Sequence, residues 1–307
     1  MDVNRSLTNI GQFTGTLFDP KIASANDYAF CRQVMQRASK NYSFASGVLP
    51  ADRLRHVEAL YALMRVGDDR VDVSFDGFSS PLAAIEDWEA TYWNAFERGE
   101  SPDPVMRAYL DTAVKFNIPK ETMAAYFRAM KEDLTITRFE TFDELLHYID
   151  GSAIPVGRAM THILGVRRDC MIEDALPGAD SLSIAMQLSN FWRDIGEDWG
   201  IGRVYIPQED LWTFGYSEND LAASHITPAF IALLEFEFER TERYYDRARE
   251  SVKMLATGRW GVMSALEIYR AILSNIRRNR YDVFSQRARA STLQKAGLVV
   301  KSIFQAG

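Results

Sequence analysis

The segment QLSNFWRDIGEDWGIGRVYIP, from Gln187 to Pro207, combines a helical pattern with acidic side chains at regular spacing. Asn190, Asp194 and Asp198 recur every four residues, so in an α-helix their side chains lie within an arc of about 80°. Carboxylates at this spacing repel one another and weaken an isolated helix, and a bound hard cation would offset that repulsion. The alternative is an acidic, solvated helix face, but the aromatic and aliphatic neighbours leave little of this helix polar. We therefore predict metal ligands along one helix face.

A second acidic cluster, GDDRVD from Gly67 to Asp72, follows a helical run that extends from His56 to Val66. Asp68 and Asp72 are four residues apart and would project from the same side of that helix. Two helices that each carry such residues could face one another across a cavity and hold Mg²⁺ ions. Mg²⁺ prefers oxygen ligands and binds proteins through one or two carboxylates together with substrate phosphates. The two clusters therefore indicate a diphosphate ligand.

The chain resembles the squalene and phytoene synthase family. The two family signatures are similar to YALMRVGDDRVD (Tyr61 to Asp72) and to the segment from Gln187 to Pro207. The second signature is long and specific, whereas an isolated DDxxD motif would be weak evidence. The resemblance continues through ASKNYSFASGVLP (Ala38 to Pro50), DLTITRFETFDELLHYIDGSAIPVG (Asp133 to Gly157) and YRAILSNIRRNRYDVFSQRA (Tyr269 to Ala288), and so covers nearly the whole chain.

The resemblance implies an all-α isoprenoid-synthase fold, a single helical bundle around a central cavity. It also implies an enzyme, a prenyltransferase that joins two allylic prenyl diphosphates head to head through a cyclopropylcarbinyl diphosphate. The ending YDVFSQRA (Tyr281 to Ala288) and the lack of a C-terminal anchor favour phytoene synthase, which uses two geranylgeranyl diphosphates in carotenoid biosynthesis. The alternative is a fifteen-carbon enzyme that makes squalene, dehydrosqualene or presqualene diphosphate. Mg²⁺ is the expected cofactor, Mn²⁺ could replace it, and NADPH is not expected.

Residue roles follow from the resemblance, position by position. The implied metal ligands are Asp68, Asp72, Asn190, Asp194 and Asp198, and the four carboxylates among them form the implied catalytic set together with Tyr61 and Tyr205. The residues implied to bind the substrate diphosphate are Ser39, Arg65, Gln187, Arg193, Arg203, Tyr269 and Arg287. Arginine recognises phosphate oxygens and aromatic faces stabilise cations. The alternatives are salt bridges to the acidic clusters for the arginines and core packing for the aromatic residues.

Other positions have two interpretations from sequence. Asp69 points about 100° away from the preceding Asp on its helix, whereas Glu197 falls near the acidic face of the other helix. Asp150 stands where the family commonly has an aromatic residue or His, so it could accept a proton or face solvent. Gln286 replaces the first of two usual basic residues. The basic contact to diphosphate therefore either passes to Arg287 or is lost.

The amino-acid composition is that of a globular protein and argues against nucleic-acid binding. The chain has 307 residues, of which 47% are hydrophobic and 25% charged, as in ordinary soluble globular proteins. Its net charge of −7 gives no basic footprint for nucleic acid. We expect residues 1–25 to form an irregular N-terminal segment and residues 26–307 to form a single all-helical prenyl-synthase domain.

Cellular location is inferred from cysteines and from terminal patterns. Cys31 and Cys170 are far apart and form no CxxC motif, so a disulfide framework or zinc site is not expected and a cytoplasmic location fits. The N-terminus has neither a secretory nor a transit pattern. No uninterrupted apolar run reaches the roughly eighteen residues that span a bilayer, so any membrane contact would be peripheral. No pattern indicates an oligomeric state.

Apolar residues at helical spacing, punctuated by Pro and Gly, predict a series of helices. The first is expected to be capped by Asn26 or Asp27, and the second to start at Pro50 and run into the first acidic cluster. The later helical ranges are 81–99, 104–117, 120–137, 217–224, 228–257 and 259–288, with a short helix after Thr292.

Two further segments are expected to border the central cavity. The helix with the second acidic cluster should begin at Ser181, after a loop that contains Pro177, and should end near Trp199. The helical range 141–166 contains small residues that would allow close approach by another helix or by a substrate chain. Pro155 should bend it, either towards the cavity or for packing only.

Other function classes have weaker support. Glu144 and His147 have the E-x-x-H spacing of a di-iron bundle, but such sites need a second copy. Neither a Walker A loop nor a strand-bound G-x-G-x-x-G motif is present. A terpene cyclase, which consumes one substrate, has metal signatures of different spacing. A non-catalytic assembly factor related to the family would be expected to have lost its acidic clusters, and here both are intact.

Overall fold

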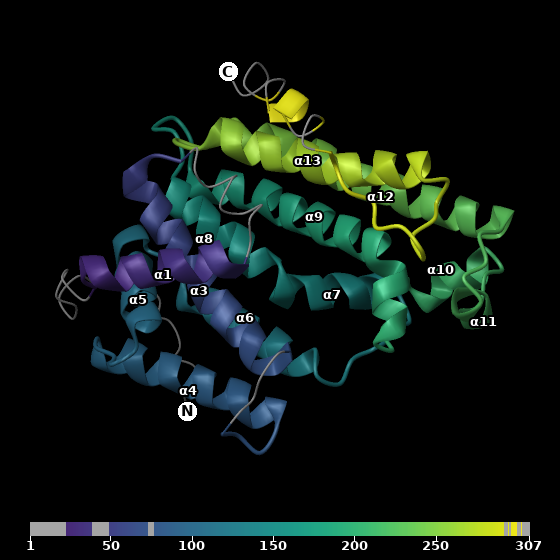
Figure 1. Cartoon of the computed structure of the whole chain (residues 1–307). Coiled ribbons are helices and arrows are strands. Elements are labelled where there is room, and N and C mark those ends of the chain that lie inside the picture. The colour runs from purple at the N-terminus through teal and green to yellow at the C-terminus, as the bar shows by residue number, and fades with distance from the viewer. Residues whose placement is uncertain are drawn as a thin grey trace, which may run out of the picture. The chain divides into compact units, whose positions relative to one another are not determined.

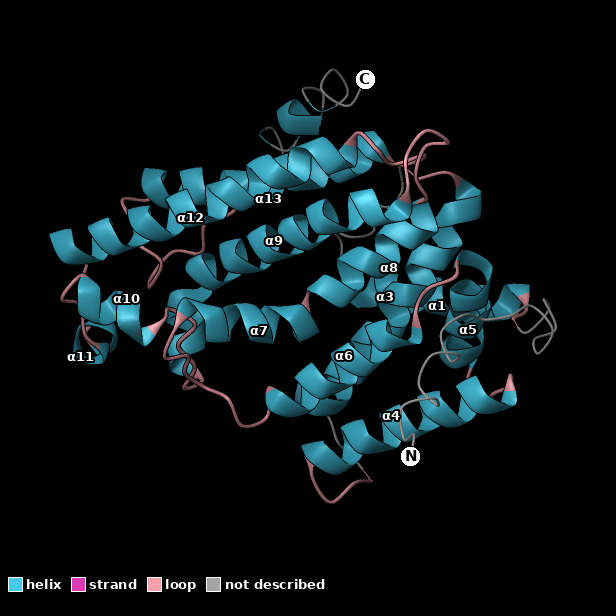
Figure 2. Cartoon of the chain, turned by 180° about the vertical axis from the view of Figure 1, so that it is seen from behind, coloured by secondary structure: helices cyan, strands magenta, loops and turns pink. Residues whose placement is uncertain are grey.

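The computed structural model describes residues 23–38, 49–72, 77–291, 294, 296–299 and 302. Within these ranges the regular elements are α-helices, and β-type pairing is limited to an isolated bridge between Val166 and Leu255 (Figure 2). The predicted all-α class is therefore confirmed. Ser39 and residues 1–22 of the predicted N-terminal segment lie outside the described residues.

The chain divides into two compact units, Met1–Leu134 and Thr135–Gly307. The helices of the first unit are α1 (Ala25–Ala38), α3 (Ala51–Asp72), α4 (Pro81–Arg98), α5 (Pro104–Phe116) and α6 (Lys120–Glu132). α3 packs against the other four, and its buried side follows a helical repeat through Val57, Leu60, Leu63 and Met64. The apolar periodicity of this segment therefore selects the face that the neighbouring helices cover.

Helix α1 is capped by Ser24, which was not among the predicted caps. The hydroxyl of Ser24 accepts a hydrogen bond from the backbone of Asp27 at 3.3 Å, and the Asp27 carboxylate accepts one from the Ser24 backbone at 2.8 Å. This reciprocal pair is a capping box with Ser24 at the N-cap. The prediction that Asn26 or Asp27 caps the helix was wrong, because Asp27 supplies the second half of the box.

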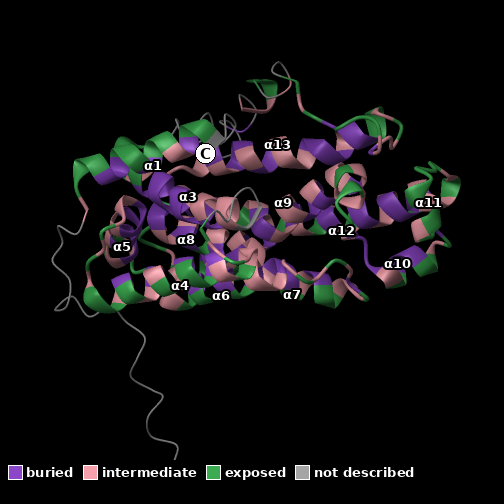
Figure 3. Ribbon diagram, turned by 60° about the horizontal axis from the view of Figure 1, so that its bottom comes forward, coloured by how far each residue is buried: buried purple, intermediate pink, exposed green. Residues whose placement is uncertain are grey.

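The second unit is organised around its longest helix. It contains α7 (Phe142–Ser152), α8 (Ile154–Leu164), α9 (Ile172–Gly200), α10 (Gln208–Thr213), α11 (Glu218–Ala222), α12 (Pro228–Val252) and α13 (Arg259–Arg278). α9 contacts α7, α8, α11, α12 and α13, and it runs beside α12 and α13 (Figure 1). The buried sides of α9 and α12 in Figure 3 form the core of this unit.

Two polar contacts fix the rotation of α9 against α12. Trp192 Nε1 donates a hydrogen bond to Thr241 Oγ1 at 2.9 Å. The hydroxyls of Ser189 and Tyr245 lie 2.7 Å apart, also within a buried interface. Because these α9 residues lie on the side opposite the acidic residues, the contacts turn the acidic side away from α12.

Helix α9 begins at Ile172 and not at Ser181, so the predicted start was wrong. The Pro177-Gly178 pair resembles a loop signal, but both residues lie inside the helix. Pro177 is near the helix start, so its missing N–H removes only one early backbone hydrogen bond. A Cβ at Gly178 would lie 2.1 Å from the Cβ of Ser251. Gly178 therefore serves close packing of α9 on α12.

The predicted helical range 141–166 consists of two helices that meet at Ala153. Pro155 lies in the first turn of α8, where the missing N–H costs no helical hydrogen bond. A Cβ at Gly157 would lie 2.1 Å from the Ser183 hydroxyl of α9. Gly157 therefore allows α8 and α9 to approach each other closely.

Other predicted boundaries were too long. α6 ends at Glu132, and α13 ends at Arg278. Beyond α13, Arg280 and Tyr281 adopt left-handed backbone angles with φ of 55° and 62°, which interrupts the helix. The chain then turns at residues 282–285 and lies against α9 at Gly196.

Candidate active site

The predicted row of oxygen donors is formed on α9. Asn190, Asp194 and Asp198 all lie within this helix and are half-buried. The helix extends to Gly200, close to the end that was predicted near Trp199. The three side chains therefore share one side of a regular helix.

Asp194 is held between two arginines. Arg193 Nε donates to Asp194 Oδ1 at 2.7 Å and Arg193 Nη2 donates to Oδ2 at 2.5 Å. Arg287, from the segment after α13, donates from Nη2 to the same Oδ2 at 2.8 Å. The Asp194 side chain is only 15% exposed. Salt bridges to the acidic cluster, one of the two predicted arginine roles, are therefore present in this structure.

Arg287 also contacts a second carboxylate. Its Nη1 lies 3.0 Å from Glu197 Oε2, so the guanidinium spans Asp194 and Glu197, which are three residues apart on α9. Glu197 is thereby engaged by an arginine of a distant segment.

Asp198 has an unusual electrostatic environment. The pKa of Asp198 is raised to about 7, chiefly by burial and also by the neighbouring charges of Asp194 and Glu197, whereas the charges of Arg203 and Arg287 act in the opposite direction. A carboxyl group with such a pKa is partly protonated near neutral pH unless a positive charge compensates it. Positive charge close to Asp198 therefore stabilises its carboxylate form, as Arg203 and Arg287 do here.

The loop after α9 is fixed by backbone contacts. The Arg203 amide donates to the Asp198 carbonyl at 2.8 Å, and the Val204 amide donates to the Thr137 carbonyl at 3.0 Å. Arg138 Nη1 donates to the Gly202 carbonyl at 2.6 Å. These bonds place the side chains of the loop next to the C-terminal end of α9.

Tyr205 belongs to an aromatic cluster. Its ring stacks on Phe191 with centroids 3.8 Å apart and planes 8° from parallel. Phe139 and Tyr148 lie 5.8 Å and 5.9 Å from the Tyr205 ring. Tyr148 was not among the predicted site residues, although it lies within a segment that carries the family resemblance and on the buried side of α7.

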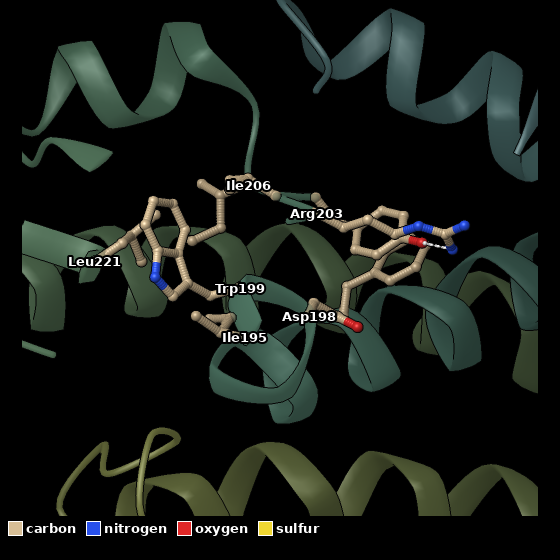
Figure 4. A pocket seen from close by; sticks show the side chains of 9 residues that line it. Ile195, Asp198, Trp199, Arg203, Ile206 and Leu221 are labelled. Carbon is tan, nitrogen blue, oxygen red and sulfur yellow. Dashed lines mark hydrogen bonds between the residues drawn. The ribbon is translucent and has the colours of Figure 1, made fainter. Parts of the chain in front are cut away.

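A small pocket lies beside this cluster, and Phe191 and Tyr205 form part of its wall. In Figure 4, Asp198 and Arg203 lie at one end of it, and Trp199 and Leu221 lie at the other. The other residues that line the pocket are aromatic and aliphatic: Phe191, Ile195, Val204, Tyr205 and Ile206. The pocket therefore joins a charged end to an apolar interior.

Two other predicted residues lie near the acidic side of α9. Tyr269 of α13 is close to Arg193 and Asp194: burial raises the pKa of Tyr269, the Arg193 charge lowers it, and the Asp194 charge raises it. Gln187 is half-buried and precedes Asn190 by one helical turn. Both residues therefore border the predicted diphosphate site.

The first acidic cluster lies at the C-terminal end of α3. Arg65 Nη2 pairs with Asp69 Oδ1 at 2.5 Å, so Asp69 is engaged in a salt bridge within its own helix. Tyr61 precedes Arg65 by one turn and is half-buried. Asp72 lies in α3, but its side chain is outside the described residues.

Asp68 has a partner from α6. The Tyr126 hydroxyl lies 3.3 Å from Asp68 Oδ1 and donates to the Met64 carbonyl at 2.9 Å. A Cβ at Gly67 would lie 2.1 Å from the same hydroxyl. The glycine therefore allows Tyr126 to reach the acidic end of α3.

Asp150 lies near the charged surface of α8. The pKa of Arg158 is raised first by its hydrogen bond to Asp180, and the charge of Asp150 adds to this effect. Asp150 follows Tyr148 by two residues on α7, so its side chain points roughly 160° away from the aromatic cluster.

The family model for squalene/phytoene synthase matches residues 35–294 of the chain. The chain belongs to the squalene/phytoene synthase family. Members of this family are prenyltransferases that join prenyl diphosphates head to head, and this chain is an enzyme of that class.

Individual relatives agree with the family assignment. The phytoene synthase of Arthrospira platensis is 32% identical over 281 residues, which cover 88% of this chain and 90% of that protein. The 15-cis-phytoene synthase of Synechococcus elongatus is 31% identical over 277 residues, which cover 87% and 89%.

Solved structures of the family share the fold. A squalene synthase from Alicyclobacillus acidocaldarius superposes with a TM-score of 0.75 at 28% identity, covering 84% of this chain and 95% of that chain. A dehydrosqualene synthase in complex with a ligand gives a TM-score of 0.81 at 26% identity, covering 91% and 96%.

The donor set on α9 suits a hard divalent cation. Among the described residues, no group of three or more His, Cys, Asp or Glu side chains is arranged to hold a metal ion by itself. Asn190, Asp194 and Asp198 instead offer oxygen atoms, and Mg²⁺ commonly takes one or two carboxylates and completes its shell with water and substrate phosphates. The residues present therefore fit a hard divalent cation that shares its coordination shell with phosphate oxygens.

None of the described helices combines the length and the apolarity that a bilayer span requires.

Proposed function

We propose that this prenyltransferase condenses two geranylgeranyl diphosphates to phytoene through a cyclopropylcarbinyl diphosphate intermediate. The observation that carries the proposal is the pocket in which Asp198 and Arg203 lie beside the stacked Tyr205 and Phe191 rings. In such a pocket, Arg203 can attract a diphosphate directly and Asp198 can hold a cation that binds it. The aromatic faces can stabilise an allylic cation. Two relatives above 30% identity are phytoene synthases, which favours the twenty-carbon substrate.

We propose Mg²⁺ as the cofactor, with Mn²⁺ as a substitute and without NADPH. The proposed ligands are Asn190, Asp194 and Asp198 on α9 together with Asp68 and Asp72 on α3. Bound Mg²⁺ supplies Lewis acidity that neutralises the negative charge of the departing diphosphate.

Arginines and polar residues are proposed to bind the diphosphate. Arg193 and Arg287 already lie at the Asp194 carboxylate, and their donors form the planar fork that suits phosphate oxygens. The other proposed contacts come from Ser39, Arg65, Gln187, Arg203 and Tyr269.

The apolar part of the pocket is proposed to protect the cation. Tyr205 presents a ring face that is already ordered by Phe191 and by a 3.2 Å hydrogen bond from Arg203 to its hydroxyl. An ordered aromatic wall stabilises positive charge without offering a nucleophile, and it excludes water. Tyr61 is proposed to contribute in the same way from α3.

Condensation of two farnesyl diphosphates is the second candidate, because a squalene synthase and a dehydrosqualene synthase share the fold at 28% and 26% identity. The test incubates the protein separately with fifteen-carbon and twenty-carbon diphosphates, each with and without NADPH, and measures product mass. We expect a forty-carbon hydrocarbon from the twenty-carbon substrate without NADPH. A thirty-carbon product alone would support the second candidate, and no diphosphate release from either substrate would favour a non-catalytic assembly factor.

A further inference from the structure

Arg287 joins two carboxylates of very different exposure. Its Nη2 donates to Asp194, whose side chain is 15% exposed, and its Nη1 contacts Glu197, whose side chain is 58% exposed. Asp194 already receives hydrogen bonds from Arg193 on both of its oxygens. Arg287 is therefore the second arginine that contacts the Asp194 carboxylate.

The backbone that carries Arg287 is fixed against α9. A Cβ at Gly196 would lie 2.8 Å from both Phe284 Cα and the Val283 carbonyl oxygen, so this segment rests directly on the helix. Phe284 packs against Phe230 of α12 with ring centroids 5.4 Å apart. The backbone that precedes Arg287 is therefore anchored on α9 and α12.

The turn before Arg287 is also closed locally. The Asp282 carboxylate accepts hydrogen bonds from the Phe284 and Ser285 amides at 3.2 Å and 2.8 Å, and from the Ser285 hydroxyl. On the other side of Arg287, Ala288 is buried. Anchors on both sides of the arginine restrict its guanidinium to the rim of the acidic site.

We propose that Glu197 is a positioning residue that holds Arg287 at this rim for contact with a substrate diphosphate, and that Glu197 is not itself a metal ligand. This inference rests on the proposed diphosphate-dependent function. A cation held by Asp194 would repel the guanidinium that shares that carboxylate. Glu197 then keeps one arm of the Arg287 fork in place while the other arm turns to phosphate oxygens. The outward position of Glu197 suits this role because it lies beside the 281–287 segment.

Calorimetric titration with inorganic diphosphate at saturating Mg²⁺ tests the inference, because its readout is binding and not turnover. Arg287→Gln should weaken diphosphate binding by at least about tenfold, as expected for loss of a charge-assisted contact. Glu197→Gln should weaken it by about threefold. The double variant should match Arg287→Gln alone, because Glu197 acts only through the arginine.

The alternatives give different results. If Glu197 were a metal ligand, Glu197→Gln would weaken binding further in the Arg287→Gln background, and this would overturn the inference. Wild-type binding in Glu197→Gln would overturn it as well. Glu239→Gln, which breaks an exposed salt bridge to Arg243 on α12, is the matched control and should bind normally. Wild-type protein that binds no diphosphate would refute the proposed function, and with it this inference.

If Glu197 served only to stabilise the fold, Glu197→Gln would lower the melting temperature and leave diphosphate affinity unchanged. Under the proposal, Glu197→Gln should keep the melting temperature of the wild type, since exposed salt bridges contribute little to stability. In turnover assays it should raise KM for the prenyl diphosphate while kcat changes less. Arg287→Lys, which keeps the charge and loses the fork, should retain part of the diphosphate affinity.

Discussion

The ring of Tyr205 lies parallel to that of Phe191, with centroids 3.8 Å apart and planes 8° from each other. Phe191 belongs to α9, whereas Tyr205 belongs to the loop that follows the helix, so the stack fixes the loop against the acidic helix. Replacement of Tyr205 by Leu should lower turnover by roughly tenfold or more, because the cation loses an aromatic face. Steady-state kinetics with a twenty-carbon diphosphate measures this effect.

Tyr205→Phe is the matched control. It keeps the ring stack and removes the hydroxyl group that accepts the 3.2 Å hydrogen bond from Arg203. Turnover close to that of the wild type is expected, with a small rise in KM if Arg203 loses orientation. Equal losses in Tyr205→Leu and Tyr205→Phe would assign the effect to the hydroxyl group and not to the ring.

Replacement of Gly67 by Ala should destabilise the first unit by about 1–3 kcal/mol, as overpacking does in a close-packed core. The added Cβ would lie 2.1 Å from the Tyr126 hydroxyl, so Tyr126 must leave both Asp68 and the Met64 carbonyl. Denaturant unfolding measures the change in free energy. The double variant Gly67→Ala with Tyr126→Phe removes the clashing oxygen and should recover part of the loss. No recovery would show that the strain lies elsewhere in α3.

The acidic row on α9 was predictable because it depends only on local spacing. Asn190, Asp194 and Asp198 repeat every four residues, and a regular helix converts that repeat into one side. The contact between Arg287 and Asp194 spans 93 residues, and its geometry depends on how the segment after α13 packs on Gly196. The family resemblance implied a diphosphate contact for Arg287. The contact between Arg287 and Glu197 could not be predicted, because it depends on this packing.

The misplaced start of α9 has a different cause. Pro177 and Gly178 together form a local signal for a turn, but packing on α12 needs a glycine at position 178 because Ser251 approaches closely. Tertiary packing therefore outweighs the local preference. Tyr148 was missed for a similar reason, since its ring becomes part of the aromatic cluster only when α7 and the loop after α9 come together.

Acid should destabilise the first unit through His56. Arg55 Nε and Lys115 Nζ lie 3.2 Å and 3.3 Å from His56 Nε2, so this nitrogen is the acceptor and Nδ1 carries the proton towards Thr112 Oγ1 at 2.9 Å. Burial, followed by the charge of Lys115, lowers the pKa of His56 to about 3. The folded state therefore favours the neutral form of the His56 imidazole.

The sign of the pH effect follows from this shift. Between the folded pKa and the unfolded value of about 6.5, the unfolded chain binds the extra proton. The stabilisation is therefore fully present above pH 6.5 and is lost as the pH falls, by up to about 1.4 kcal/mol per pH unit. Denaturant unfolding between pH 7 and pH 4 should give a steeper loss for the wild type than for His56→Gln. Equal slopes for the wild type and His56→Gln would contradict the role of His56.

Replacement of Asp194 by Ala should remove the proposed cation site while the fold persists. The change deletes the central carboxylate of α9 and leaves Arg193 and Arg287 without their shared acceptor. Because charge stabilisation of the leaving diphosphate is worth several kcal/mol, turnover should fall by at least about a thousandfold. Circular dichroism should show unchanged helix content. Asp180→Ala on the same helix breaks only the salt bridge to Arg158 and should keep turnover, which separates loss of the site from loss of a surface charge. Chelation of divalent cations should inactivate the wild type reversibly, and turnover by Asp194→Ala at the wild-type rate would rule out its role as a ligand.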